Sequence, residues 1–100
     1  MKAQVKAGYQ AATMDKMEIM PMVLKLVEET GELAEAVNHK LGHLPNKKMK
    51  EPLEGEVADV ILCAIGVLTK AYPDESFTKI YDRLIEHMDK KSARWLERAK

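Results

Sequence analysis

The chain has 100 residues and a mass of 11.3 kDa, which predicts a single domain over residues 1–100 and excludes a two-domain enzyme. Lys and Arg number 16, as do Asp and Glu, so a net charge of zero provides no overall attraction to nucleic acid or an anionic membrane. The longest uncharged run, Val60–Thr69, is far shorter than the about 20 residues of a bilayer span. Because no signal-peptide apolar stretch follows Met1, we expect a soluble cytoplasmic protein.

Ala, Leu, Met, Glu and Lys dominate the composition and only five aromatic residues occur, which predicts an all-α fold. Glycines and prolines divide the chain into four helical segments. The first predicted helix covers about residues 3–14. The second covers about residues 20–40, with Pro21 suited to its first turn and Gly42 just beyond its end.

A polar loop over residues 43–50, carrying Lys47, Lys48 and Lys50, separates the second and third predicted helices. The third helix begins near Pro52 and continues to about residue 71, where Tyr72-Pro73 stops it. The fourth helix opens with Asp74 as its N-cap and runs to about residue 98.

The third helix is the least amphipathic of the four, because its apolar side chains point in nearly every direction. It must therefore be covered on more than one side, and three other short helices can hardly enclose it. We expect a short bundle of about four helices that is completed by homo-oligomerisation, as a dimer or tetramer. The single cysteine, Cys63, lies in this apolar run and is expected to pack in the core.

Acidic residues are concentrated in the middle of the chain. Glu29 and Glu32 lie three residues apart on one predicted helix, as do Glu56 and Asp59 on the next, so each pair projects from a single face. If the two helices pack antiparallel, four carboxylates meet at one level, where their repulsion requires a compensating cation. Carboxylates without His or Cys partners suit a hard ion such as Mg²⁺ or Mn²⁺.

An alternative interpretation is that these acids are solvated side chains on helix surfaces. Glutamate is a good helix former, so Glu29 and Glu32 fit that interpretation as readily as they fit a metal site. Asp59 fits it less well, because Asp is unfavourable in a helix interior and directly precedes the most apolar stretch of the chain.

The stretch Glu28-Glu29-Thr30-Gly31-Glu32 is followed, after 23 residues, by Glu56-Val57-Ala58-Asp59. This pattern resembles the E-E-x-x-E and E-x-x-D signature of MazG-like nucleoside triphosphate pyrophosphohydrolases, and the resemblance extends over about residues 24–95. It implies an all-α, Mg²⁺-dependent enzyme, with Mn²⁺ as a substitute. Such an enzyme cleaves a ribo- or deoxyribonucleoside triphosphate between its α and β phosphates, releasing the monophosphate and pyrophosphate, in nucleotide-pool house-cleaning.

The resemblance also implies roles for individual residues. Glu28 would be an outer member of the catalytic site that orients a ligand or helps to activate water. The stretch Lys91-Ser92-Ala93-Arg94-Trp95 is similar to the family's basic stretch ending in Arg and Trp, although the family more often has Asn in place of Lys91. Lys91, Arg94 and Trp95 would thus bind the substrate. The Mg²⁺ ligands that the resemblance implies are Glu29, Glu32, Glu56 and Asp59.

Two other functions fit parts of the pattern. Phosphoribosyl-ATP pyrophosphohydrolase is a small, helical enzyme that catalyses the same type of reaction, but the sequence of residues 31–36 favours the MazG-like interpretation. A non-catalytic helical interaction module would carry the same acids merely on its surface, and would release no pyrophosphate in the presence of Mg²⁺. Zero net charge and few aromatic residues argue against nucleic-acid binding. We expect base recognition to use the first helix or a neighbouring subunit.

Overall fold

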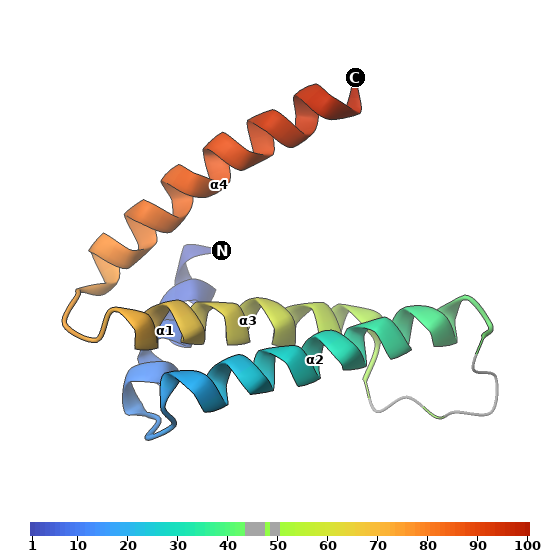
Figure 1. Cartoon of the computed structure of the whole chain (residues 1–100), viewed down its shortest axis with the longest axis horizontal. Coiled ribbons are helices and arrows are strands. Elements are labelled where there is room, and N and C mark those ends of the chain that lie inside the picture. The colour runs from blue at the N-terminus through green and yellow to red at the C-terminus, as the bar shows by residue number, and fades with distance from the viewer. Residues whose placement is uncertain (44–47, 49–50) are drawn as a thin grey trace.

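The computed structural model describes residues 1–43, 48 and 51–100, and within these ranges the chain forms helices and no strand. The helices are α1 (Lys2–Met14), α2 (Ile19–Lys40), α3 (Leu53–Ala71) and α4 (Phe77–Ala99), as Figure 1 shows. The all-α prediction is confirmed, and the starts of α1, α2 and α3 fall within one residue of their predicted positions. The predicted loop residues Lys47 and Lys50 lie outside the described residues.

Gly42 ends α2 where the sequence predicts. Its φ of 82° is a left-handed conformation that glycine adopts without a Cβ clash. Its N–H donates to the carbonyl of His39 at 3.0 Å, and the next N–H, of His43, donates to the carbonyl of Asn38 at 2.9 Å. This pair of bonds is a Schellman motif, which satisfies two carbonyls that the helix end would leave unpaired.

The predicted start of α4 is wrong by two residues. The N-cap is Ser76, whose hydroxyl accepts a hydrogen bond from the N–H of Lys79 at 3.3 Å, and Asp74 does not cap the helix. The physical reason is the corner between α3 and α4, where the N–H of Glu75 donates to the carbonyl of Tyr72 at 3.2 Å. Asp74 lies inside this turn, so the helix begins only after it.

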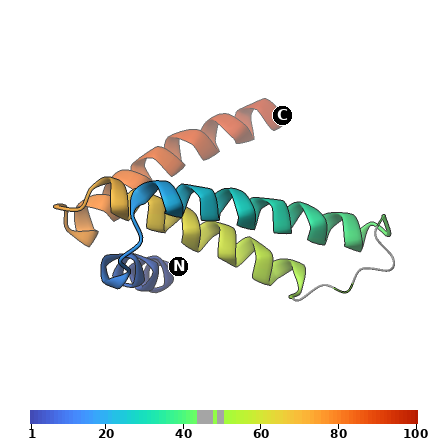
Figure 2. The same cartoon turned by 60° about the horizontal axis from the view of Figure 1, so that its bottom comes forward.

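Figures 1 and 2 show α2 and α3 side by side in opposite directions, with α1 lying across one end of the pair. The close approach of α1 depends on Gly8, because a Cβ there would lie 3.2 Å from Cδ2 of Leu62. The prediction that α3 is covered on more than one side is confirmed, since both α1 and α2 pack against it. The antiparallel pair α2 and α3 forms the frame on which the acidic residues sit.

Among the residues that the structure describes, α4 joins the rest of the chain through its N-terminal part. The ring of Phe77 lies 5.5 Å from that of Tyr9 on α1, and the Tyr9 hydroxyl donates to the carbonyl of Glu75 at 3.3 Å. Beyond this contact α4 projects away from α2 and α3 (Figure 1), which leaves Trp95 69% and Leu96 64% exposed.

The described chain is more open than a typical monomer of its size. Its accessible surface is 7585 Å², against about 5,700 Å² expected for this mass, and its radius of gyration is 15.7 Å, against about 13 Å. No helix within the described ranges combines the length and the apolar character required to cross a bilayer. Large apolar side chains remain exposed on α2, α3 and α4, among them Leu24, Val27, Val57, Ile61, Trp95 and Leu96.

Candidate metal centre

The antiparallel packing of α2 and α3 brings acidic side chains of the two helices together. One ligand atom from each of Glu29, Glu32 and Glu56 lies within 4.8 Å of the others, and we name these residues the first carboxylate group. Ligand atoms of Glu51, Glu56 and Asp59 meet the same limit and form the second carboxylate group. The four residues predicted as ligands therefore lie in two adjoining groups, which share Glu56.

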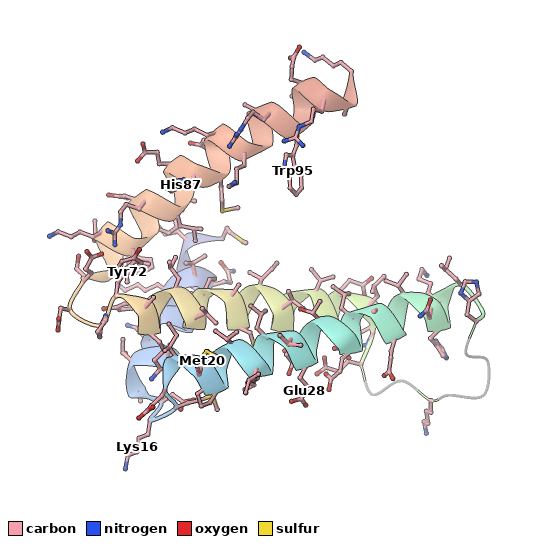
Figure 3. The ribbon with its side chains drawn as sticks, in the orientation of Figure 1. Lys16, Met20, Glu28, Tyr72, His87 and Trp95 are labelled. Atoms are coloured by element: carbon pink, nitrogen blue, oxygen red, sulfur yellow. The ribbon has the colours of Figure 1, made fainter. Side chains whose placement is uncertain are left out.

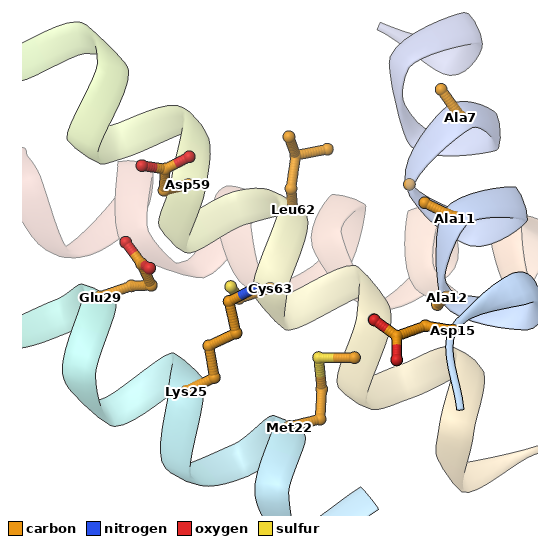
Figure 4. A pocket seen from close by; sticks show the side chains of 12 residues that line it. Ala7, Ala11, Ala12, Asp15, Met22, Lys25, Glu29, Asp59, Leu62 and Cys63 are labelled. Carbon is orange, nitrogen blue, oxygen red and sulfur yellow. The ribbon is translucent and has the colours of Figure 1, made fainter. Parts of the chain in front are cut away.

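Glu56 is the most buried of these acids, with 4% of its surface exposed, because it lies on the side of α3 that faces α2. Asp59 on α3 and Glu29 on α2 lie on facing helices, as Figure 4 shows, and the charge of Asp59 acts on Glu29. The three-residue spacing within each helix places both members of a pair on the same face. The convergence that the spacing predicts is therefore present in the folded chain.

Burial is the main reason that the pKa of Glu29 is raised above its ordinary value. The negative charges of Glu32 and Asp59, a side-chain hydrogen bond with Glu32 and the charge of Glu56 raise this pKa further. The Oε2 atom of Glu29 is buried, and no described residue donates a hydrogen bond to it. An oxygen in this environment is suited to accept a cation.

The second carboxylate group shows the same crowding of negative charge. The pKa of Glu51 is raised, first by the charge of Asp59 and a side-chain hydrogen bond with Asp59, and then by burial and the charge of Glu56. The donor atoms of both groups are carboxylate oxygens, which is the set that a hard divalent ion prefers. The chemistry of these residues therefore fits Mg²⁺ or Mn²⁺ better than zinc.

A pocket of about 380 Å³ lies beside Glu29 and Asp59, between α1, α2 and α3 (Figure 4). Its cation is Lys25, the one basic residue among the described residues that line it. Cys63 lines the pocket and is half-buried, rather than enclosed in the core as predicted. Burial is the largest cause of the raised pKa of its thiol, and Lys25 opposes the shift only in part. The wall on α1 consists of small residues, namely Ala7, Gly8, Ala11 and Ala12.

Other predicted site residues lie apart from the two carboxylate groups. Glu28 is exposed on α2, belongs to neither group and points away from α3 in Figure 3. Lys91, Arg94 and Trp95 are exposed on the distal half of α4, and Figure 3 shows Trp95 far from the α2 and α3 pair. A single chain therefore does not bring the predicted substrate-binding residues to the predicted metal ligands.

Two residues of the site escaped the sequence-based prediction. Lys25 lies four residues before Glu29, a spacing that places both on one face of α2 and could have revealed it. Glu51 lies five residues before Glu56 and precedes the first residue of α3, so helical periodicity gives no signal for its position.

Comparison with known proteins gives a family match over most of the chain. A model of the MazG nucleotide pyrophosphohydrolase domain matches residues 18–95, a range that contains both carboxylate groups. The uncharacterized protein YpjD of Bacillus subtilis (strain 168) is 30% identical over 95 residues, which cover 92% of this chain and 78% of that protein. No solved structure gives a significant match.

Proposed function

Because this chain belongs to the MazG nucleotide pyrophosphohydrolase family, we propose that it hydrolyses ribo- or deoxyribonucleoside triphosphates between the α and β phosphates. The products are the nucleoside monophosphate and pyrophosphate, and the physiological role is nucleotide-pool house-cleaning. The observation that carries the proposal is the meeting of Glu29, Glu32 and Glu56 within 4.8 Å, with Asp59 in the adjoining group. A surface role for these acids would not require Glu56 to be 4% exposed.

The proposed metal ligands are Glu29, Glu32, Glu56 and Asp59. Mg²⁺ bound there would polarise the phosphoryl oxygens and lower the pKa of a bound water, and Mn²⁺ would substitute for it. The carboxylates hold the polyphosphate indirectly, because direct contact between the two sets of negative charge would be repulsive.

The reaction needs one proton acceptor from the chain. Attack of a water oxygen on the α phosphorus forms one P–O bond and breaks the bond to the bridging oxygen, which leaves with pyrophosphate. A carboxylate of the site accepts the proton of the attacking water. The outer role proposed for Glu28 would require a group that approaches α2 from the side opposite α3, as a second subunit would.

The pocket between α1, α2 and α3 is the proposed position of the nucleoside. It adjoins Glu29 and Asp59, so a base and sugar held in it would present the α phosphate toward the carboxylates. The small side chains of Ala7 and Ala11 leave room for a planar base. Lys25 provides a positive charge at the same edge, where it would offset part of the charge of the triphosphate.

The roles proposed for Lys91, Arg94 and Trp95 require a homo-oligomer. These residues are exposed on α4 and stand apart from the acids of their own chain. In a dimer or tetramer, α4 of one subunit would reach the carboxylates of another. The exposed apolar side chains of α2, α3 and α4 support such an assembly, because burying them stabilises association.

The test is turnover of a panel of canonical and modified nucleoside triphosphates with Mg²⁺, beside the Glu56→Gln variant. Because the substitution removes a charged ligand from the buried position between α2 and α3, we expect release of pyrophosphate to fall by about 100-fold or more. Circular dichroism checks that the helical fold is kept. The Glu54→Gln variant is the matched control, since Glu54 is exposed on the same turn of α3 and belongs to neither carboxylate group.

Unchanged turnover of the Glu56→Gln variant would remove Glu56 from the mechanism. Preferential hydrolysis of phosphoribosyl-ATP would favour that alternative enzyme instead. A chain that releases no pyrophosphate from any triphosphate would be a helical interaction module.

A further inference from the structure

Among the described residues that line the pocket between α1, α2 and α3, Asp15 supplies the one carboxylate that belongs to neither carboxylate group. It follows the last residue of α1, and Figure 4 shows it at the end of the pocket away from Glu29 and Asp59. We propose that Asp15 recognises the base of the nucleotide and selects guanine, so that guanosine and deoxyguanosine triphosphates are the preferred substrates. This inference rests on the proposed function, since it requires the nucleoside to lie in this pocket.

Three hydrogen bonds hold Asp15 in position. Its N–H donates to the carbonyl of Ala11 at 3.0 Å, and its own carbonyl accepts a hydrogen bond from Nζ of Lys70. Its Oδ1 accepts from the N–H of Met17 at 2.7 Å, which forms an Asx turn and orients the carboxylate before any ligand binds. Oδ1 retains a second lone pair, and no described residue donates to Oδ2, so the carboxylate can accept further hydrogen bonds.

The side chains near Asp15 provide apolar contacts for the faces of a base. Met22 is buried, and its Sδ would lie 3.2 Å from a Cβ at residue 66, so Gly66 allows this thioether to pack against α3. A thioether makes favourable contacts with aromatic rings. Ala11 and Ala12 line the same pocket from α1. The faces of a base would therefore meet apolar groups, while its edge would meet the carboxylate of Asp15.

The order of side chains along α2 matches the order of groups in a nucleotide. Met22, Lys25 and Glu29 all line the pocket, and the helical rise places Glu29 about 10.5 Å further along the axis than Met22. A base beside Met22 and Asp15 would direct the phosphates toward Lys25 and Glu29. Asp15 would then determine specificity without contacting the reacting atoms.

The hydrogen-bonding capacity of a carboxylate favours guanine over the other bases. An ionised carboxylate only accepts hydrogen bonds, and an unpaired base is recognised at its Watson–Crick edge. Guanine presents two adjacent donors there, N1–H and the 2-amino group, which two carboxylate oxygens can accept together. Adenine and cytosine present an amino group beside an acceptor nitrogen, and uracil presents one N–H between two carbonyls. Each of these edges would place an acceptor against an oxygen of Asp15, which leaves polar groups unpaired.

The experiment compares bases instead of overall activity. The kcat/KM values of GTP, ATP, CTP, UTP and ITP are measured with Mg²⁺, and binding of the corresponding monophosphates is measured by calorimetry, which requires no turnover. Inosine differs from guanosine only by the absence of the 2-amino group. We expect the wild-type chain to prefer GTP to ITP, and GMP to IMP, by about tenfold or more.

Asp15→Asn separates base recognition from the fold. The amide oxygen can still accept the hydrogen bond from Met17, whereas an NH₂ donor replaces Oδ2. We expect the preference for GTP to fall by about tenfold or more, and xanthosine triphosphate, whose C2 carbonyl accepts from that donor, to become a better substrate than GTP. A merely structural role would not exchange one base for another. Glu18→Gln, an exposed change of the same charge outside the pocket, is the matched control and should keep the preference for guanine.

The outcomes distinguish this inference from the proposed function. Equal kcat/KM for GTP and ITP in the wild-type chain, or an unchanged base preference in Asp15→Asn, would overturn the role of Asp15. Hydrolysis of triphosphates in those cases would leave the proposed function standing. Selective binding of GMP by a chain that hydrolyses no triphosphate would keep the role of Asp15 and reject the function. A chain that neither hydrolyses nor binds guanine nucleotides would reject both.

Discussion

Glu29 carries a buried carboxylate oxygen to which no residue in the described part of the chain donates a hydrogen bond. The charged groups that raise its pKa are acids on the same helix and on the helix opposite, so the folded chain gathers negative charge around a partly buried carboxylate. Such a side chain opposes folding when it is charged and has no cation beside it. It contributes to the fold only when a proton or a metal ion neutralises it.

This situation predicts an unusual dependence of stability on pH. The pKa of Glu29 is raised from 4.5, foremost by burial, so the folded state binds the proton more tightly than the unfolded state. The free energy of unfolding should therefore be highest below pH 4.5. It should decline as the pH rises through the raised pKa of Glu29. We expect metal-free Glu29→Gln to be more stable than the wild type at neutral pH, and the difference to shrink as the pH falls toward 4.5.

Thermal unfolding followed by circular dichroism measures this difference. Saturating Mg²⁺ should reverse the order of the two proteins, because it stabilises only the chain that retains the carboxylate. Parallel melting temperatures of the two proteins across the pH range, with and without Mg²⁺, would contradict the account of Glu29.

The helices differ in how far the sequence predicts them, and local signals explain the difference. Gly42 with its left-handed φ and Pro52 ahead of α3 act within one turn, so the facing ends of α2 and α3 were predictable. Asp74 and Ser76 can both cap a helix, and only the turn at Tyr72 selects Ser76. Local signals also fail for α1, whose place across α3 depends on a tertiary contact at Gly8.

If the nucleoside occupies the pocket as proposed, α1 is the element that would decide which nucleotides fit. An Ala11→Phe substitution would fill the pocket beside Glu29 and Asp59, so we expect the KM for every triphosphate to rise by about tenfold or more. Binding of Mn²⁺ should be unchanged, because α1 contributes no carboxylate to either group. Steady-state kinetics and Mn²⁺ titration measure the two effects separately.

Gln10→Phe is the matched control for α1, since residue 10 is exposed on the same helix and does not line the pocket. Its KM should equal that of the wild type. If Ala11→Phe left every KM unaltered, the nucleoside would have to bind elsewhere.

The site as a whole was more predictable than the assembly that would complete it. Helical spacing predicted that Glu29 and Glu32 would face Glu56 and Asp59, and the resemblance to MazG-like enzymes is confirmed by the match over residues 18–95. Glu51 was missed because it reaches its partners from outside the helix. The place of Arg94 relative to the acids is not encoded in local spacing, since it depends on how complete chains pack.

Helix α4 carries an apolar stripe that is interrupted at Lys91 and Ser92, and the described residues cover only the first half of this stripe. Ile80 is buried and Phe77 is half-buried, whereas Met88, Trp95 and Leu96 are 49%, 69% and 64% exposed. The excess of exposed surface in the isolated chain, 7585 Å² against about 5,700 Å² expected, has the same origin. The second half of the stripe is therefore the surface on which we expect subunits to meet.

A charge placed on that stripe should dissociate the homo-oligomer. Leu96→Glu removes an apolar side chain whose burial contributes about 1.5–3 kcal/mol, and it would bury a carboxylate at the interface. We expect the wild type to have the mass of a dimer or tetramer in light scattering coupled to size exclusion, and the variant to have the 11.3 kDa mass of a single chain. Turnover should fall with dissociation while Mn²⁺ binding is kept, because the carboxylates belong to one chain and Arg94 would be contributed by another.

Arg98→Glu, an exposed change of charge on the same turn, should preserve both mass and turnover. A wild-type chain that is monomeric and fully active at assay concentration would show instead that α4 completes the site within its own chain, by swinging onto α2 and α3.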